Sequence, residues 1–189
     1  MTNQVDVTKN SVTAIAAQLA DREAIRHCIL RYCRGLDRLD EEVLREVYWP
    51  EATDDHLAYS GSADGFIELA RDMLSTVIPR TQHLMGNILI EMLNDTSAHV
   101  ESYFQAYHLM KDENGGNDDL FVAGRYVDRF EKRNDEWRIA DRSVIVDWFR
   151  QYEDTHQFSD KKPLGIMDAR PGHELGARKP DDRSYKLMA

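Results

Sequence analysis

The chain has few of the residues that staple a small domain or anchor it in a membrane. Its two cysteines, Cys28 and Cys33, stand five residues apart and belong to no CxxC or CxxxH ligand pattern. Buried thiols behave as small apolar side chains, so we expect both to pack in the core of a protein kept in a reducing, cytoplasmic setting. No apolar run approaches the roughly 20 residues that a membrane-spanning helix needs. The run 12–17 is too short for the apolar region of a signal peptide.

The sequence also has fewer basic than acidic residues. The 189 residues carry 24 Lys and Arg against 34 Asp and Glu, a formal net charge of −10 with histidine neutral. Such a surface repels phosphate backbones and anionic lipid, so we expect neither nucleic acid nor membrane as a partner. The same charge favours a small, hydrophobic substrate over a polyanion.

Several catalytic signatures are missing. The sequence has no glycine-rich phosphate loop, no GxSxG nucleophile turn, and no HxH, HxxxH or HExxH pair among its seven histidines. His99 and His108 have opposite parity on a predicted strand, so both cannot face one pocket without a bulge. We therefore expect no cofactor and no metal ion.

The length and the charge distribution indicate one domain with an appendage. A chain of 189 residues is near the usual size of a single domain. Residues 155–189 have no helical or strand period and carry a net charge of +2, whereas residues 1–154 carry −12. We expect residues 1–154 to form the domain, and residues 155–189 to form an irregular tail that packs on it or on a neighbouring subunit.

Apolar periodicity predicts three helices followed by a sheet. The first helix covers about 21–34, with Gly35 placed to end it in a left-handed cap. Asp40 can cap the second helix, and Ser62 or Asp64 the third. Beyond residue 79 the period changes to two, which predicts antiparallel strands at Thr81–Leu93, His99–Met110, Leu120–Phe130 and Trp137–Phe149, and a shorter strand is expected at about 52–59. The fold class is therefore α+β, with the helices on one face of a long curled antiparallel sheet.

Strand alternation places polar side chains among apolar ones at four positions. His83 and Asn87 share a mixed face of the first long strand, which is typical of a ligand pocket. His108 lies among apolar neighbours, and Arg142 lies on a largely apolar face where it needs a carboxylate partner. The opposite face of the first strand is purely apolar, so helices or another subunit must cover Leu84, Ile88, Ile90 and Met92.

Taken alone, the candidate residues have ordinary structural explanations. Asp37 follows the predicted end of the first helix and fits a turn aspartate. His83 fits a hydrogen-bonded core histidine, and Tyr32 lies on the apolar face of its helix. His56 fits a pocket wall and a solvent-facing loop equally well.

Four segments carry a family resemblance over about residues 15–150. They are Arg31–Asp37, Thr81–Asn87, Gly124–Phe130 and Trp137–Arg142. Each resembles the SnoaL-like branch of the nuclear transport factor 2-like superfamily, which includes scytalone dehydratase, bile-acid 7α-dehydratase and hexachlorocyclohexane dehydrochlorinase. The resemblance implies a cone-shaped curved sheet closed by three helices around a deep pocket, a cystatin-like α+β barrel. Because this scaffold hosts many reactions, the motifs predict the fold better than the chemistry.

The resemblance also implies an acid/base site. Asp37 would hold His83, and Tyr32 or Tyr48 would donate a hydrogen bond to a developing oxyanion or leaving hydroxyl. Arg142 would orient Asp37 or an anionic substrate. The substrate-pocket candidates are Tyr48, Trp49, His56, Asn87, His108 and Tyr126.

The function expected is that of a cofactor-free lyase of the dehydratase kind, or an isomerase, acting on a small hydrophobic, polycyclic or aromatic substrate. The alternative is a non-catalytic binding or assembly subunit of the same fold. Relatives assemble through their sheets, so the resemblance further implies a homo-oligomer, with a trimer favoured over a dimer.

Overall fold

The structure is a computed structural model that describes residues 9–111, 116–153 and 176–187. The helices are α1 (Lys9–Arg38), α2 (Glu41–Val47), α3 (Ala63–Thr76) and, in the tail, the short α4 (Arg183–Leu187). The strands are β1 (Tyr48–His56), β2 (Tyr59–Ser62), β3 (Arg80–Asn94), β4 (Ser97–Lys111), β5 (Asn117–Arg133) and β6 (Glu136–Tyr152).

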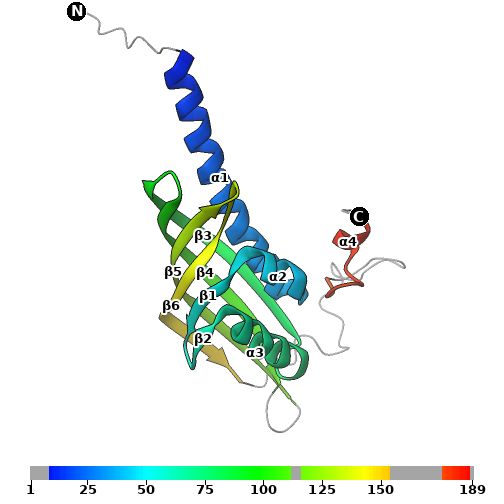
Figure 1. The fold of residues 1–189 in the computed structure, drawn as a ribbon. Coiled ribbons are helices and arrows are strands. Elements are labelled where there is room, and N and C mark those ends of the chain that lie inside the picture. The colour runs from blue at the N-terminus through cyan, green and yellow to red at the C-terminus, as the bar shows by residue number, and fades with distance from the viewer. Residues whose placement is uncertain (1–8, 112–115, 154–175, 188–189) are drawn as a thin grey trace, which may run out of the picture.

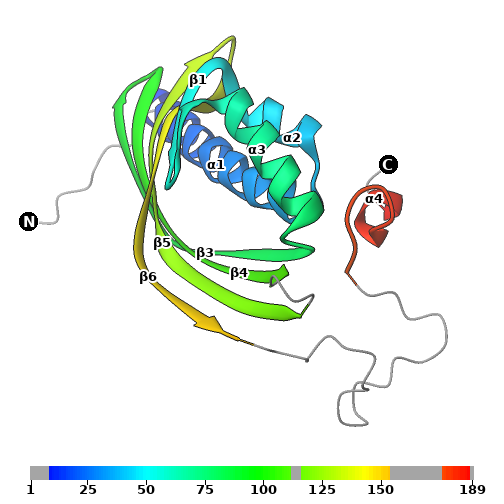
Figure 2. The same ribbon diagram turned by 90° about the horizontal axis from the view of Figure 1, so that it is seen from below.

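The molecule has two layers. Helices α1, α2 and α3 lie together on the concave side of one strongly curled sheet (Figures 1 and 2). The strand order is β2-β1-β6-β5-β4-β3, with β1 parallel to β6 and the long strands antiparallel. The predicted α+β class is confirmed, and the sheet is not closed, because β2 and β3 form two separate edges.

Helix α1 ends four residues later than predicted. Leu39, with φ of 52°, is the left-handed residue, and the backbone N–H of Asp40 donates to the carbonyl of Gly35 at 2.8 Å. Gly35 is needed for another reason: a Cβ there would lie 2.7 Å from Leu44 Cδ2, so the missing side chain allows α2 to pack closely. Asp37 therefore lies within the last turn of α1 and not beyond it.

The capping predictions hold for the next two helices. The Asp40 carboxylate accepts from the N–H of Val43 at 3.4 Å, and the Ser62 hydroxyl from the N–H of Gly65 at 3.2 Å. The single short strand expected near residues 52–59 is two strands, because Leu57 takes a φ of 58° and turns the chain between β1 and β2.

A β-bulge in β3 overturns part of the predicted alternation. Pairing with β4 shifts register between Met85 and Ile88, and the extra residue reverses which side chains face the helices. Asn87 is consequently exposed on the outer face and lies outside any inner pocket, whereas Ile90 is buried in the core. The four residues predicted to share one face are therefore divided: Leu84 lies on the outer face, whereas Ile88, Ile90 and Met92 pack against the core.

The tail falls partly outside the described residues. Of residues 155–189, the structure describes 176–187. This part packs on the body at the end of α1, where the backbone N–H of Lys179 donates to the carbonyl of Arg38 at 2.9 Å. The Tyr185 hydroxyl donates to Asp40 at 2.7 Å.

Candidate active site

Asp37 and His83 meet where the last turn of α1 crosses the start of β3. His83 Nδ1 lies 2.7 Å from Asp37 Oδ1, and the backbone N–H of His83 donates to both carboxylate oxygens at 3.1 and 3.0 Å. The two side chains are only 7% and 14% exposed. A carboxylate near a helix C-terminus meets the unfavourable end of the helix dipole, and these donors offset that cost.

This geometry prepares the imidazole for proton transfer. An aspartate bound at Nδ1 holds the proton on that nitrogen and leaves Nε2 free to accept one. Once His83 takes a second proton, the carboxylate at 2.7 Å stabilises the imidazolium. The predicted contact between Asp37 and His83 is thus present in the structure.

An apolar cavity of about 270 Å³ adjoins the histidine. It lies between α3 and the inner face of the sheet, and half-exposed side chains such as Leu69 and Met73 of α3 face into it. Four of the predicted site residues line it, namely His56, His83, His108 and Tyr126. Its apolar walls with a few converging polar groups are typical of a small-molecule site.

His108 is a neutral histidine in this cavity. Burial, and to a lesser extent the nearby His83 and His56, lower the pKa of its imidazole to about 3. Its Nδ1 lies 2.9 Å from the hydroxyl of Thr81, and its ring meets His83 edge-on with centroids 5.7 Å apart. His108 therefore acts at neutral pH as an uncharged hydrogen-bonding group.

Arg142 has a partner that the sequence analysis did not name. Its guanidinium donates to both oxygens of Asp128 at 2.7 Å, and neither side chain is exposed. Burial alone would lower the pKa of Arg142, but Asp128 outweighs it and raises that pKa above its usual value. The predicted role of orienting Asp37 is therefore wrong. The pairing of β5 with β6 would have identified this partner, because Asp128 lies directly opposite Arg142.

Tyrosines surround this ion pair beneath the cavity. The rings of Tyr32 and Tyr126 lie 4.0 and 4.3 Å from the Arg142 guanidinium carbon. Tyr48 donates to Asp54 at 2.5 Å. Burial raises the pKa of Tyr32 and of Tyr48, which keeps both phenols protonated.

Trp49 lies away from the cavity. Its indole N–H donates to the backbone carbonyl of Glu131 at 3.1 Å, and its ring is sandwiched between Arg133 and Arg138 at 4.7 and 4.8 Å. Of the residues predicted for the substrate pocket, Tyr48, Trp49 and Asn87 do not line the apolar cavity. Both predicted core cysteines are buried, and burial raises the pKa of each thiol to about 12.

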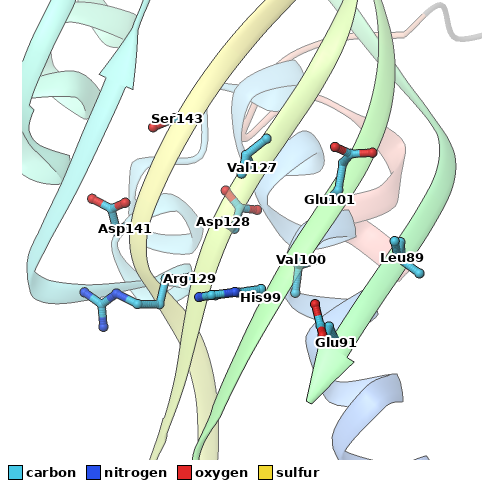
Figure 3. A pocket seen from close by; sticks show the side chains of 10 residues that line it. All are labelled: Leu89, Glu91, His99, Val100, Glu101, Val127, Asp128, Arg129, Asp141 and Ser143. Carbon is cyan, nitrogen blue, oxygen red and sulfur yellow. The ribbon is translucent and has the colours of Figure 1, made fainter. Parts of the chain in front are cut away.

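Two further hollows lie outside the apolar cavity. One, of about 620 Å³, is polar and lies against Asp37, His83 and the tail residue Arg178. The other, of about 340 Å³, lies on the outer face of the sheet, where Figure 3 shows its lining, including His99, Arg129 and Glu101. Only the polar hollow shares a residue of the Asp37–His83 pair with the apolar cavity.

The described residues hold neither a candidate metal site nor a candidate membrane-spanning helix. No group of three His, Cys, Asp or Glu side chains in the described ranges could hold a metal ion. No helix in the part of the chain that the structure covers is long and apolar enough to cross a membrane.

Comparisons with known proteins agree with the fold. Hexachlorocyclohexane dehydrochlorinase 1 of Sphingobium indicum is 22% identical over 142 residues, which are 74% of this chain and 90% of the relative. The crystal structure of a hexachlorocyclohexane dehydrochlorinase from Novosphingobium barchaimii superposes with a TM-score of 0.67 at 17% identity, covering 75% and 96% of the two chains. A scytalone dehydratase-like protein from Novosphingobium aromaticivorans gives a TM-score of 0.65 at 21% identity, covering 73% and 91%.

These distant homologues support a family of lyase-like small-molecule enzymes. The family model of the SnoaL-like domain matches residues 17–143, which contain most of α1, all of α2, α3 and β1 to β5, and the first half of β6. The chain therefore belongs to the SnoaL-like domain family.

Proposed function

We propose that the protein is a cofactor-free lyase that removes a proton and a β-leaving group from a small, largely apolar substrate. The Asp37–His83 pair at the wall of an apolar cavity is the observation that carries this proposal. The distant dehydrochlorinase relatives, whose named activity is an elimination, support the same class of reaction.

The reaction begins at His83 Nε2. This nitrogen takes a proton from a carbon that a neighbouring carbonyl makes acidic, while Asp37 stabilises the imidazolium. The C–H electron pair forms the new double bond, and the leaving group departs with the pair of its own bond. An isomerase shares the first step and differs in returning the proton to another carbon.

The cavity favours a small substrate. Its volume of about 270 Å³ lies near the lower end of ordinary ligand pockets. Two charged groups near it, Asp37 and Arg142, are already paired within the protein, Asp37 with His83 and Arg142 with Asp128, so neither is left to bind a charged group of a substrate. A neutral ring compound with one carbonyl group is therefore the substrate class that this site suits best.

Turnover of two probes tests the proposal. β-Hydroxycyclohexanone and β-chlorocyclohexanone would be followed by the absorbance of cyclohexenone, and α-proton exchange would be followed by NMR in D₂O. His83→Ala should lower elimination and exchange by about 10²–10⁴-fold, because it removes the general base. The matched control is His99→Gln, on the outer face, which should leave both rates unchanged.

Retention of the wild-type rates by His83→Ala would overturn the proposal. Binding of the probes without elimination or exchange would favour the non-catalytic binding protein instead.

The homo-oligomer remains a proposal, and the surface proposed for its interface differs from the apolar face of the first long strand that the sequence indicated. Large apolar side chains on the outer face of the sheet are at least 38% exposed, and a second copy of the chain would remove them from water. They are Leu84, Leu89, Tyr103, Phe121, Val127, Ile145 and Trp148.

A further inference from the structure

Strand β1 brings a second carboxylate–histidine pair to the same cavity. Asp54 and His56 stand two residues apart and project from one face of the strand. Asp54 Oδ1 lies 3.4 Å from His56 Nδ1. The imidazole stacks on Phe66 with centroids 4.4 Å apart, lines the cavity and is 23% exposed. The pair therefore faces the cavity from a different strand than His83.

The Asp54 carboxylate is fully buried, but only one of its two oxygens accepts a hydrogen bond. Tyr48 donates to its Oδ2 at 2.5 Å, whereas Oδ1 has no hydrogen-bond partner among the described residues. His56 Nδ1 is likewise buried without one. Leaving such atoms unpaired costs about 1–3 kcal/mol each, so unsatisfied buried groups often mark a functional position.

Arg142 does not neutralise Asp54. Both of its short hydrogen bonds go to Asp128, so this part of the described interior holds two buried carboxylates and one buried guanidinium. With a proton on both ring nitrogens, His56 would supply the missing positive charge, and its Nδ1–H would be the donor that Asp54 Oδ1 lacks. The second ring nitrogen, Nε2, would then carry an N–H available to a bound ligand.

We propose that His56, positioned by Asp54, is a second acid/base group of this cavity and protonates an oxygen leaving group. The inference rests on the proposed lyase function. His83 Nε2 takes the α-proton, and the C–H electron pair forms the C=C bond. The C–O bond breaks with its electron pair on oxygen, and the proton of His56 Nε2 converts that oxygen to the hydroxyl of water or of an alcohol. His83 ends as imidazolium and His56 as neutral imidazole, and exchange with solvent restores both.

A proton donor at this position selects the substrate class. Hydroxide and alkoxide are strong bases that leave readily only when protonated, whereas chloride leaves as a stable anion. The second pair is therefore useful for loss of water or an alcohol and superfluous for loss of chloride. We infer that the natural substrate carries a β-hydroxyl or β-alkoxy group, in contrast to the named substrate of the dehydrochlorinase relatives.

The test compares two leaving groups on one ring. β-Hydroxycyclohexanone and β-chlorocyclohexanone would be given to the full-length wild type, His56→Gln, His83→Gln and the outer-face control His99→Gln. His56→Gln should lower kcat/KM for the hydroxyl compound by about 10²–10⁴-fold and change that for the chloride by less than about threefold. His83→Gln should lower both.

Three outcomes are decisive. An equal effect of His56→Gln on both compounds, or no effect on either, overturns the role of His56. Should His56→Gln fail to fold by circular dichroism, His56→Phe keeps the stacking on Phe66 and takes its place. A wild type that neither eliminates nor exchanges the α-proton overturns the lyase function itself, and the role of His56 with it.

Asp54 would act only through His56, as a positioning residue. Asp54→Asn should reproduce the leaving-group dependence of His56→Gln while α-proton exchange stays at the wild-type rate. A purely structural loss would lower elimination and exchange together.

Discussion

The two aspartate–histidine pairs of this protein are held in different ways. Asp37 and His83 come from a helix and a strand, and three short hydrogen bonds join them, two of which involve the backbone of His83. Asp54 and His56 come from one strand, and their facing atoms lie 3.4 Å apart without a hydrogen bond. The side chains of the first pair are hydrogen-bonded to each other, and those of the second are not.

Strand geometry explains the difference. Residues two apart on a strand are separated by about 6.6 Å along the chain and project in parallel, so their side chains do not converge. Residues from crossing elements can point directly at each other. The first pair is therefore preorganised for proton abstraction, whereas the second can adjust to a leaving group that enters beside it.

The largest expected effect concerns the ion pair beneath the second aspartate–histidine pair. Asp128→Ala should lower the free energy of unfolding by about 3–5 kcal/mol, because it leaves the Arg142 guanidinium buried and unpaired. Urea denaturation monitored by circular dichroism measures the change.

The double variant Asp128→Leu with Arg142→Met is the matched control. It should recover most of this loss, since it removes both charges of the Arg142–Asp128 pair together. A loss below about 1 kcal/mol in Asp128→Ala would show that the Asp54 side of the cavity does not depend on this pair.

Sequence predicted the first aspartate–histidine pair better than the second, for a physical reason. Asp37 and His83 lie in segments whose spacing resembles the family, so their meeting was expected although the helix end was misplaced by four residues. Asp54 carried no such signal. Its burial depends on β1 pairing in parallel with β6, which apolar alternation cannot reveal.

The errors in the pocket have equally local causes. Asn87 was misplaced because one extra residue in a β-bulge reverses every side chain beyond it. Trp49 was predicted to line the pocket. Consecutive residues of a strand face opposite sides of the sheet, and the Trp49 indole instead donates to the backbone carbonyl of Glu131. Arg142 was correctly expected to need a carboxylate, and only strand register identifies that carboxylate as Asp128.

A smaller effect on stability is expected from His108. Unlike the two paired histidines, it contacts a hydroxyl group, that of Thr81, and not a carboxylate. Its pKa is about 3 in the folded protein, against about 6.5 in an unfolded chain. The unfolded state therefore binds the proton first, so the stability that neutral His108 provides is complete above pH 6.5 and declines as the pH falls toward 3.

His108→Phe removes this dependence. Between pH 7 and pH 5 the wild type should lose about 1–2 kcal/mol more than the variant, measured by urea unfolding at both pH values. Equal losses in the two proteins would mean that His108 is protonated in the folded state, and the cavity would then hold a cation where we describe a neutral group.

The two aspartate–histidine pairs also differ in whether the tail covers them, and removing the tail should have the smallest effect on stability. Tail residue Arg178 donates to the carbonyl of Ile78 at 2.7 Å and lines the polar hollow in front of Asp37 and His83. The second pair has no described tail residue near it. Removing residues 176–189 should lower the free energy of unfolding by no more than about 2 kcal/mol, since the ion pairs of the tail are partly exposed and each contributes about 0–1 kcal/mol.

The same deletion should open one end of the site only. Carbethoxylation by diethyl pyrocarbonate, located by mass spectrometry, should accelerate at His83 and remain unchanged at His56, because only His83 shares a hollow with the tail. Equal acceleration at both histidines would mean that the deletion loosens the whole cavity. No acceleration at either would mean that the tail, although it packs on α1, does not limit access to the Asp37–His83 pair.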